Sequence, residues 1–228
     1  MKYDEIIRNL KSMSNLKNVE GMARFGINPK NNLGISLYQL RPLAKKIGKN
    51  HKLSLNLWES EIHDARLLAV LIEDPTKVTS YQMDKWAGDF DSWDICDQAC
   101  TNLFDRTSFA WEKIYKWSER KEEFVKRAAF SIIAGLAVHD KKASDKKFEK
   151  LFLLIKKHSR DERNYVKKAV NWALRNIGKR NMSLNKKAII VAKEIKKIDS
   201  KSTRWISSDA IRELSSEKVK QRLMKKLG

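Results

Sequence analysis

The stretch "VKRAAFSIIA" (Val125–Ala134) carries the pattern that decides the fold of this chain. It begins with a charged pair, continues with small residues and ends in a large apolar face, and two other stretches share this order: "HDARLLAVLI" (His63–Ile72) and "VKKAVNWALR" (Val166–Arg175). In each, apolar residues recur at i, i+3, i+4 and i+7, the spacing of an amphipathic helix. The sequence therefore predicts several copies of one helical unit.

The spacing of these copies predicts the architecture. Their charged anchors are Arg66, Asp97, Arg127 and Lys168, separated by about 30, 30 and 40 residues, close to the repeat length of helix-pair solenoids. A weaker copy, "WISSDAIREL", begins at Trp205. We expect an all-α solenoid of HEAT-like helix pairs, in which the second helix of each pair lines a concave basic face. The alternative is an irregular helical bundle, which a regular period disfavours.

Helical periodicity extends over most of the chain. The chain has only 3 prolines, and it has no stretch of alternating polar and apolar residues typical of a strand. Further amphipathic stretches are predicted at Ser36–Gly48, Glu61–Glu73, Glu122–His139, Asn164–Gly178 and Ser183–Ile198. The connections between them are short, so each helix should pack against its sequence neighbours. We expect one domain over residues 1–228, with N-terminal helices in 1–50 and repeats in 51–228.

The charge of the chain predicts a polyanionic partner. The net charge is +20, and Lys126–Gly228 alone hold 29 Lys and Arg against 10 Asp and Glu. Such an excess favours nucleic acid first and an anionic membrane surface second. No apolar run approaches the roughly 18 residues of a spanning helix, and no signal peptide is apparent. We expect a monomeric protein of the cytoplasm that does not enter a membrane.

An acidic stretch, "DSWDICDQ" (residues 91–98), interrupts this basic chain. Asp91 is predicted to be the N-cap of a helix. Asp94, three residues later, lies in the first turn, where the helix dipole stabilises an acid. Asp97 falls in the second turn and has no such local role.

Asp97 therefore has two interpretations. Trp93 precedes it by four residues, so the two side chains are neighbours on one helix face. A salt bridge from Asp97 to Arg127 would tie two repeats together without any chemistry. Alternatively, a carboxylate beside an indole can act on a substrate. Trp172 is a second indole in a polar setting, suited to packing against nucleic acid.

The remaining candidate ligands predict neither a metal nor a cofactor. Cys96 and Cys100 lie one helical turn apart, a poor geometry for a disulfide, and are expected to be reduced packing residues. His63 lies among acids, and we expect it on a solvated helix face. A zinc site would need more ligands at suitable spacing.

At this point the sequence resembles the AlkD-type DNA alkylation repair glycosylases, which are built from HEAT-like repeats. The matching segments occur in the family's order and cover most of the chain: "MARFGI" with "NLGISLYQLRPLAK", "SWDICD", "FVKRAAFSI" and "YVKKAVNWALR". The resemblance implies removal of cationic alkylated purines, such as N7-methylguanine and N3-methyladenine, from duplex DNA by hydrolysis of the N-glycosidic bond. It also implies that the base is not drawn into a deep pocket.

The resemblance further implies roles for single residues. Asp97 would be the catalytic carboxylate, Trp93 and Trp172 would be aromatic walls against the deoxyribose, and Arg127 would contact a backbone phosphate. The residues expected to bind DNA are Arg127, Lys167, Lys168, Arg175, Lys179, Arg180, Arg204 and Phe25.

Two positions depart from the family pattern: Phe25 stands where a tyrosine is expected, and Gly135 where a lysine is expected. Two functions from other classes stay open. One is a HEAT-repeat protein that binds DNA without hydrolysis. The other is a solenoid scaffold that binds an acidic protein.

Overall fold

The computed structural model describes residues 1–225, and this part of the chain is helical without any strand. The chain divides into two compact units, Met1–Phe109 and Ala110–Gly228, called unit 1 and unit 2. Each unit is described by itself. The expectation of a single domain stays a prediction.

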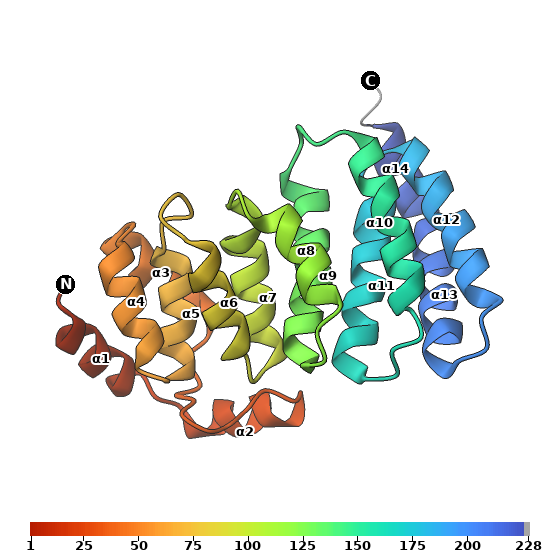
Figure 1. The fold of residues 1–228 in the computed structure, drawn as a ribbon. Coiled ribbons are helices and arrows are strands. Elements are labelled where there is room, and N and C mark those ends of the chain that lie inside the picture. The colour runs from red at the N-terminus through yellow and green to blue at the C-terminus, as the bar shows by residue number, and fades with distance from the viewer. Residues whose placement is uncertain (226–228) are drawn as a thin grey trace. The chain divides into compact units, whose positions relative to one another are not determined.

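Unit 1 is built from seven described α-helices and one short 3-10 helix, coloured red to yellow-green in Figure 1. These elements are α1 (Tyr3–Ser12), α2 (Leu16–Arg24), α3 (Leu37–Ile47), α4 (His51–Glu59), α5 (His63–Ile72), α6 (Ser80–Gly88), α7 (Trp93–Asn102) and η1 (Phe104–Arg106).

The seven described helices of unit 2 are coloured green to blue in Figure 1. They are α8 (Ala110–Ser118), α9 (Glu123–His139), α10 (Asp145–His158), α11 (Asn164–Gly178), α12 (Met182–Lys196), α13 (Lys201–Leu214) and α14 (Glu217–Met224).

Short polar side chains fix the start of many helices, because they accept a hydrogen bond from a backbone N–H that the helix cannot satisfy. Side-chain N-caps of this kind begin α2, α4, α6, α12, α13 and α14: Asn15, Asn50, Thr79, Asn181, Ser200 and Ser216. The predicted helix at Ser36–Gly48 is confirmed as α3, which ends where Gly48 adopts a φ of 74°. Glycine adopts this left-handed value without steric cost.

The helices of unit 2 pack as pairs, α8 with α9, α10 with α11 and α12 with α13. The second helices α9, α11 and α13 also pack on one another in order and form one layer, while α10 packs on α12 in the other. Side-chain hydrogen bonds between neighbouring pairs join residues 34 to 43 positions apart. This is the predicted HEAT-like arrangement, with one pair for each repeat.

Unit 1 has a shorter period. Its helices α5 and α7 pack on each other, and hydrogen bonds between successive helix pairs join residues 31 positions apart, as in His63 to Asp94 and Trp58 to Asp89. The predicted spacing of about 30 residues from Arg66 to Asp97 thus lies within unit 1, and that of about 40 residues from Arg127 to Lys168 within unit 2.

Stacked tryptophans form the core of unit 1. The rings of Trp58 and Trp86 are parallel within 2° at a centroid distance of 4.0 Å, and both are buried. The guanidinium of Arg66 lies 5.2 Å from the Trp58 ring centre and its Nε donates to the Trp58 carbonyl. An aromatic pair of this kind contributes about 0.5–1.5 kcal/mol beyond its buried area. The anchor Arg66 therefore has a structural role.

The predicted helices in unit 2 are confirmed almost residue by residue, with Asn164–Gly178 identical to α11. In unit 1 the prediction of Glu61–Glu73 was two residues too long at its start. Glu61 adopts a φ of 57°, outside the helical region, so α5 begins only at His63.

Candidate functional site

The start of α7 is held by the loop that follows α2. Ser92, with extended backbone angles, is the N-cap residue, and the prediction of Asp91 in this position is wrong. The Ser92 hydroxyl accepts a hydrogen bond from the Asn28 backbone N–H at 2.8 Å. The Asp91 carboxylate accepts one from the side-chain amide of Asn28 at 2.7 Å. Both side chains thus bind the loop instead of capping the helix, and they fix where α7 begins.

Asp94 lies in the first turn of α7 as predicted, but it also has a tertiary partner. The His63 ring Nε2 lies 2.9 Å from the Asp94 carboxylate, and His63 is only 4% exposed. The expectation of His63 on a solvated helix face is therefore wrong. Burial lowers the pKa of His63, but the hydrogen bond and the charge of Asp94 outweigh it, so that the pKa lies above its ordinary value.

This pair predicts a pH dependence of stability in unit 1. A histidine whose pKa is raised by folding stabilises the fold fully below its unfolded pKa of about 6.5 and loses this contribution as the pH rises through the folded pKa. We expect the free energy of unfolding to fall between pH 6.5 and the raised folded pKa, and Asp94→Asn to reduce this fall. Urea unfolding of both proteins across this range measures it. An unchanged slope in Asp94→Asn would mean that other groups cause the dependence.

Trp93 and Asp97 lie one turn apart on α7, both half-buried. The Trp93 indole N–H donates to the Phe25 backbone carbonyl at 3.0 Å, which fixes the ring. Behind them Cys96 and Cys100 are buried, as predicted, and are not joined by a disulfide; burial is the main cause that raises the pKa of the Cys100 thiol. The carboxylate and the indole thus stay partly exposed, in contrast to the two thiols.

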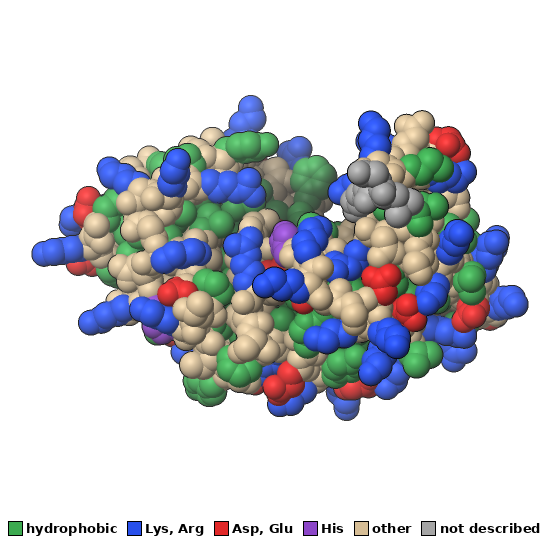
Figure 2. All heavy atoms as spheres, turned by 90° about the horizontal axis from the view of Figure 1, so that it is seen from above, with side chains coloured by type: hydrophobic (Ala, Val, Ile, Leu, Met, Phe, Trp, Pro, Cys, Tyr) green, Lys and Arg blue, Asp and Glu red, His purple; other side chains and the backbone are tan. Residues whose placement is uncertain are grey.

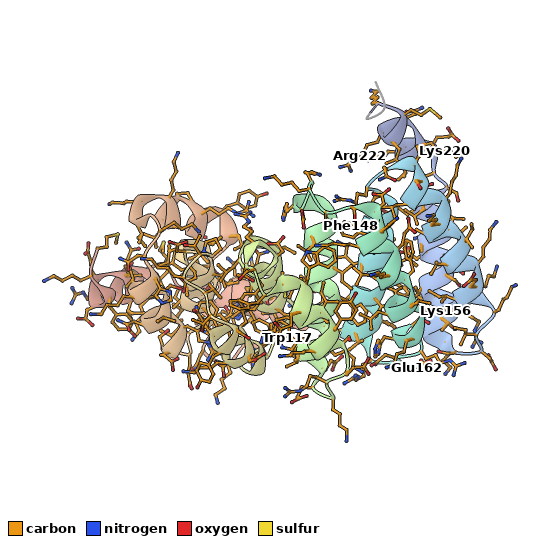
Figure 3. All side chains as sticks on the ribbon, turned by 45° about the horizontal axis from the view of Figure 1, so that its top comes forward. Trp117, Phe148, Lys156, Glu162, Lys220 and Arg222 are labelled. Atoms are coloured by element: carbon orange, nitrogen blue, oxygen red, sulfur yellow. The ribbon has the colours of Figure 1, made fainter. Side chains whose placement is uncertain are left out.

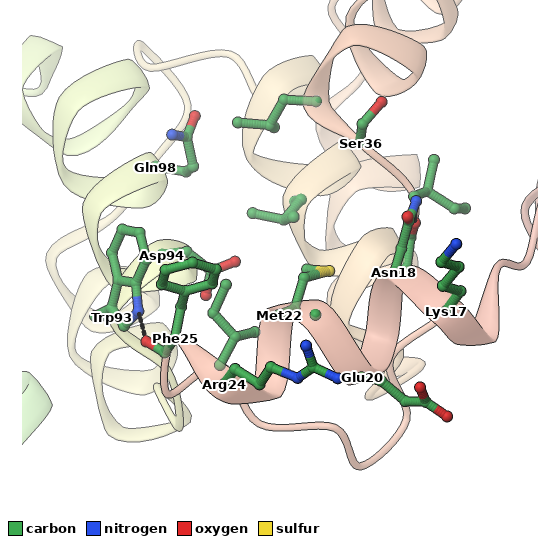
Figure 4. A pocket seen from close by; sticks show the side chains of 16 residues that line it. Lys17, Asn18, Glu20, Met22, Arg24, Phe25, Ser36, Trp93, Asp94 and Gln98 are labelled. Atoms are coloured by element: carbon green, nitrogen blue, oxygen red, sulfur yellow. Dashed lines mark hydrogen bonds between the residues drawn. The ribbon is translucent and has the colours of Figure 1, made fainter.

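A groove of about 830 Å³ opens beside Trp93, with α2 as one wall and residues of α5 and α7 opposite (Figure 4). Its lining is mostly apolar, including Met22 and Leu67. None of the residues of α2 is buried, and Phe25 just after it is 76% exposed. Trp93 and Gln98, on either side of Asp97 in the sequence, contribute to the wall. Aromatic surface of this kind suits the flat face of a nucleic-acid base.

Arg127 and Trp172, the other two residues expected in the catalytic set, belong to unit 2. Arg127 lies on α9, is 5% exposed, and donates from Nη1 to the Tyr165 carbonyl of α11 at 2.6 Å. Trp172 lies on α11 and is half-buried. Gly135 is buried within α9. The expected set is thus divided between the units, with Trp93 and Asp97 in unit 1.

Three of the cations expected to bind DNA are already paired within unit 2, and one of them, Arg204, lies with its Nη1 2.7 Å from Asp199 Oδ1 while 57% of its side chain stays exposed. Arg175 of α11 forms an ion pair with Glu213 of α13, and its Nη1 lies 3.4 Å from Asp209. Lys179 contacts the same Glu213, with 2.7 Å between Nζ and Oε1. Local patterns do not predict this pairing, because Glu213 lies 38 residues from Arg175 and 34 residues from Lys179, on another helix.

The other cations differ in their surroundings. Lys168 is exposed, and the ammonium of Lys167 lies 5.8 Å from the Trp205 ring centre. The Arg180 guanidinium donates to two backbone carbonyls, and burial lowers its pKa. Lys and Arg side chains nevertheless cover much of the face shown in Figure 2, in keeping with the net charge.

Residues 1–225 contain no group of three His, Cys, Asp or Glu side chains placed to hold a metal ion. None of the helices in that range has the length and apolar character needed to cross a membrane.

The chain is similar to two known proteins along most of its length. It is 24% identical over 200 residues to the uncharacterized protein Lin0241 of Listeria innocua serovar 6a, covering 86% of this chain and 87% of that protein. A solved structure, described as a new family of proteins related to the HEAT-like repeat DNA glycosylases with affinity for branched DNA structures, superposes with a TM-score of 0.78 at 20% identity. The match covers 93% of this chain and 95% of that one, and establishes a shared fold.

The sequence profile of one family matches this chain over residues 6–214, which span both units as far as the end of α13. That range includes the acidic turn of α7, the indole of α11 and the ion pairs between α11 and α13. The match, together with the HEAT-like fold, shows that the chain belongs to the DNA alkylation repair enzyme family.

Proposed function

We propose that the protein is a DNA glycosylase that removes cationic alkylated purines, such as N7-methylguanine and N3-methyladenine, from duplex DNA. The observation that carries this proposal is the turn of α7 in which the half-buried Asp97 follows the fixed indole of Trp93. A carboxylate kept beside aromatic surface, in a chain of net charge +20, has no evident use in holding phosphates. It suits a cationic reacting centre.

The chemistry of the substrate explains why such a simple site can be sufficient. An alkylated purine already carries positive charge, so it leaves readily and needs little general-acid help. Cleavage of the N-glycosidic bond develops positive charge on the sugar, as in other glycoside hydrolyses. A fixed carboxylate beside C1′ stabilises this charge and can orient the attacking water.

The aromatic residues and cations would complete the site. Trp93 and Trp172 are proposed as walls against the deoxyribose, where a cation–π attraction contributes about 0.5–2 kcal/mol for each ring. Arg127 is proposed to contact a phosphate near the lesion. The exposed Phe25 is proposed to contact DNA at the rim of the groove.

A base-release assay tests this function. Duplex DNA methylated at guanine N7 is incubated with the protein at low salt, and free bases are separated and measured. We expect release of N7-methylguanine with single turnovers faster than spontaneous depurination. A protein that binds the duplex but releases no alkylated base at any salt concentration is not a glycosylase.

A second candidate function is favoured by the similar solved structure, whose protein is described as having affinity for branched DNA structures. In this reading the chain binds DNA junctions without hydrolysis. A four-way junction would then bind more tightly than a linear duplex of equal length, and neither would lose a base. The third reading, a scaffold for an acidic protein, predicts no steep fall of DNA affinity with salt, whereas a DNA binder releases counterions for each phosphate contacted.

A further inference from the structure

A small basic hollow lies at one end of unit 2. It has a volume of about 80 Å³, and its cations come from three separate segments: Lys141 from the loop after α9, Lys179 from the end of α11 and Arg222 from α14. Figure 1 shows this loop and α14 at the same end of the unit, and Figure 3 labels Arg222 on α14. One water takes up about 30 Å³ in the liquid, so the hollow can admit a small anion.

Helix ends explain part of this cluster. α9 ends at His139 and α11 at Gly178, and cations near the carbonyl end of a helix are stabilised by its dipole. This accounts for Lys141 and Lys179, each within a few residues of such an end. Arg222 lies in the last turn of α14 and is stabilised in the same way, so helix ends explain each cation singly but not why three of them surround one hollow. Three cations around one hollow repel one another unless an anion lies between them.

Glu213 supplies an anion from within the fold, although it does not line the hollow. One of its oxygens lies 2.7 Å from the Lys179 Nζ and the other pairs with Arg175. Burial raises the pKa of Glu213, but the hydrogen bonds and charges of Lys179 and Arg175 outweigh it, and its pKa lies below its ordinary value. Glu213 is therefore ionised at neutral pH and holds two cations as the oxygens of a phosphate would.

We infer that the hollow lined by Lys141, Lys179 and Arg222 binds a phosphate group of the DNA backbone, and that Glu213 competes with this phosphate for Lys179. The inference rests on the DNA binding of the proposed function and is independent of base excision. It assigns the end of unit 2 as part of the DNA contact surface. It also gives Glu213 a role beside the basic end of α11: its ion pair with Lys179 limits the affinity for undamaged DNA.

The test replaces Glu213 and a matched control. Glu194 pairs with Lys156 at 2.9 Å, again across 38 residues, but in the layer of α10 and α12. Glu213→Gln and Glu194→Gln each remove one negative charge, so the net charge of the two variants is the same. Fluorescence anisotropy of a labelled undamaged duplex, titrated at several NaCl concentrations, gives the Kd and its salt dependence.

We expect Glu213→Gln to bind several-fold more tightly than Glu194→Gln, with a log–log salt slope steeper by about one. In the Lys141→Ala/Arg222→Ala background this gain should disappear, since the three cations act on one phosphate. Equal Kd values for the two glutamine variants, or a gain that persists without Lys141 and Arg222, would overturn the inference. The helical signal in the circular dichroism spectrum checks that each variant is folded.

The same titration separates the possible sources of the phosphate and the possible failures. Inorganic phosphate and chloride are compared as competitors of the duplex at equal ionic strength, with Glu213→Gln as the protein. If phosphate displaces the duplex more strongly than chloride does, the hollow also binds the free ion. If the two displace it equally, the hollow binds only the phosphates of the DNA backbone. If the wild-type protein binds no duplex at low salt, both the proposed DNA binding and the phosphate site in the hollow are wrong. If it binds DNA but the two glutamine variants have equal Kd values, only the phosphate site in the hollow is wrong.

Discussion

Replacing Asp97 by asparagine is expected to reduce release of N7-methylguanine by roughly 10²- to 10³-fold, the effect of removing one preorganised electrostatic group from an active site. Asparagine keeps the shape of the side chain but removes its negative charge and replaces one acceptor oxygen by an NH2 donor. The sugar then loses its nearest anion while the phosphate contacts persist. The affinity for methylated duplex should therefore stay the same or increase. Single-turnover base release and duplex affinity, measured side by side, give both quantities.

Asp94 provides the control for this variant. It lies on the same helix, one turn before Asp97, and its carboxylate is bound to the buried His63. Asp94→Asn removes the same charge from α7 and should leave base release close to that of the wild type. Equal activity of Asp97→Asn and wild type would remove Asp97 from the chemistry. Equal losses in both variants would indicate a general effect of charge or stability.

Replacing Asp64 by alanine is expected to have the largest effect on stability, a loss of roughly 2–6 kcal/mol in the free energy of unfolding, because two backbone donors each lose an acceptor. Asp64 of α5 is fully buried, and its two oxygens accept hydrogen bonds from the backbone N–H groups of Leu33 and Ile35 at 2.6 and 2.8 Å. Without the carboxylate, both donors lose their partners inside the fold. The loop between α2 and α3, which forms part of the groove, would lose its attachment.

Urea unfolding followed by circular dichroism measures this loss. Asp4→Ala is the control, because Asp4 is an exposed aspartate of the same unit, in the first turn of α1. Its replacement should change the midpoint little. A similarly small change for Asp64→Ala would show that the loop finds other acceptors, and that the buried carboxylate is not what holds it.

Local patterns account for the parts of the structure that were predicted well. Ser36 and Gly48 bound α3 because capping and left-handed backbone are properties of a few adjacent residues. The helix at Asn164–Gly178 was predicted residue by residue, since its apolar face repeats over four turns. The family segments likewise depend on short stretches, and they led to Trp93 and Asp97 on one turn of α7.

Predictions of single side chains failed where the partner lay on another helix. Asp91 was expected to cap α7, but Asn28, 63 residues away, binds its carboxylate and Ser92 takes the N-cap position. His63 was expected in solvent, but it is buried and its ring is hydrogen-bonded to Asp94, 31 residues away. A repeat of 31 residues in unit 1 makes the second pairing intelligible afterwards. Nothing local in the sequence distinguishes a paired histidine from a solvated one.

The sequence by itself determined the helices, their pairing into HEAT-like repeats, the positive charge and the turn that carries Asp97. These depend on periodicity, capping and composition, which act over a few residues or over the chain as a whole. Only the tertiary structure decided which charges are used internally: Glu213 on Arg175 and Lys179, Asp94 on His63, and Asp64 on its loop. Coulombic and hydrogen-bond energies depend on distances of a few ångströms, and packing alone brings residues 30 to 40 positions apart within that range.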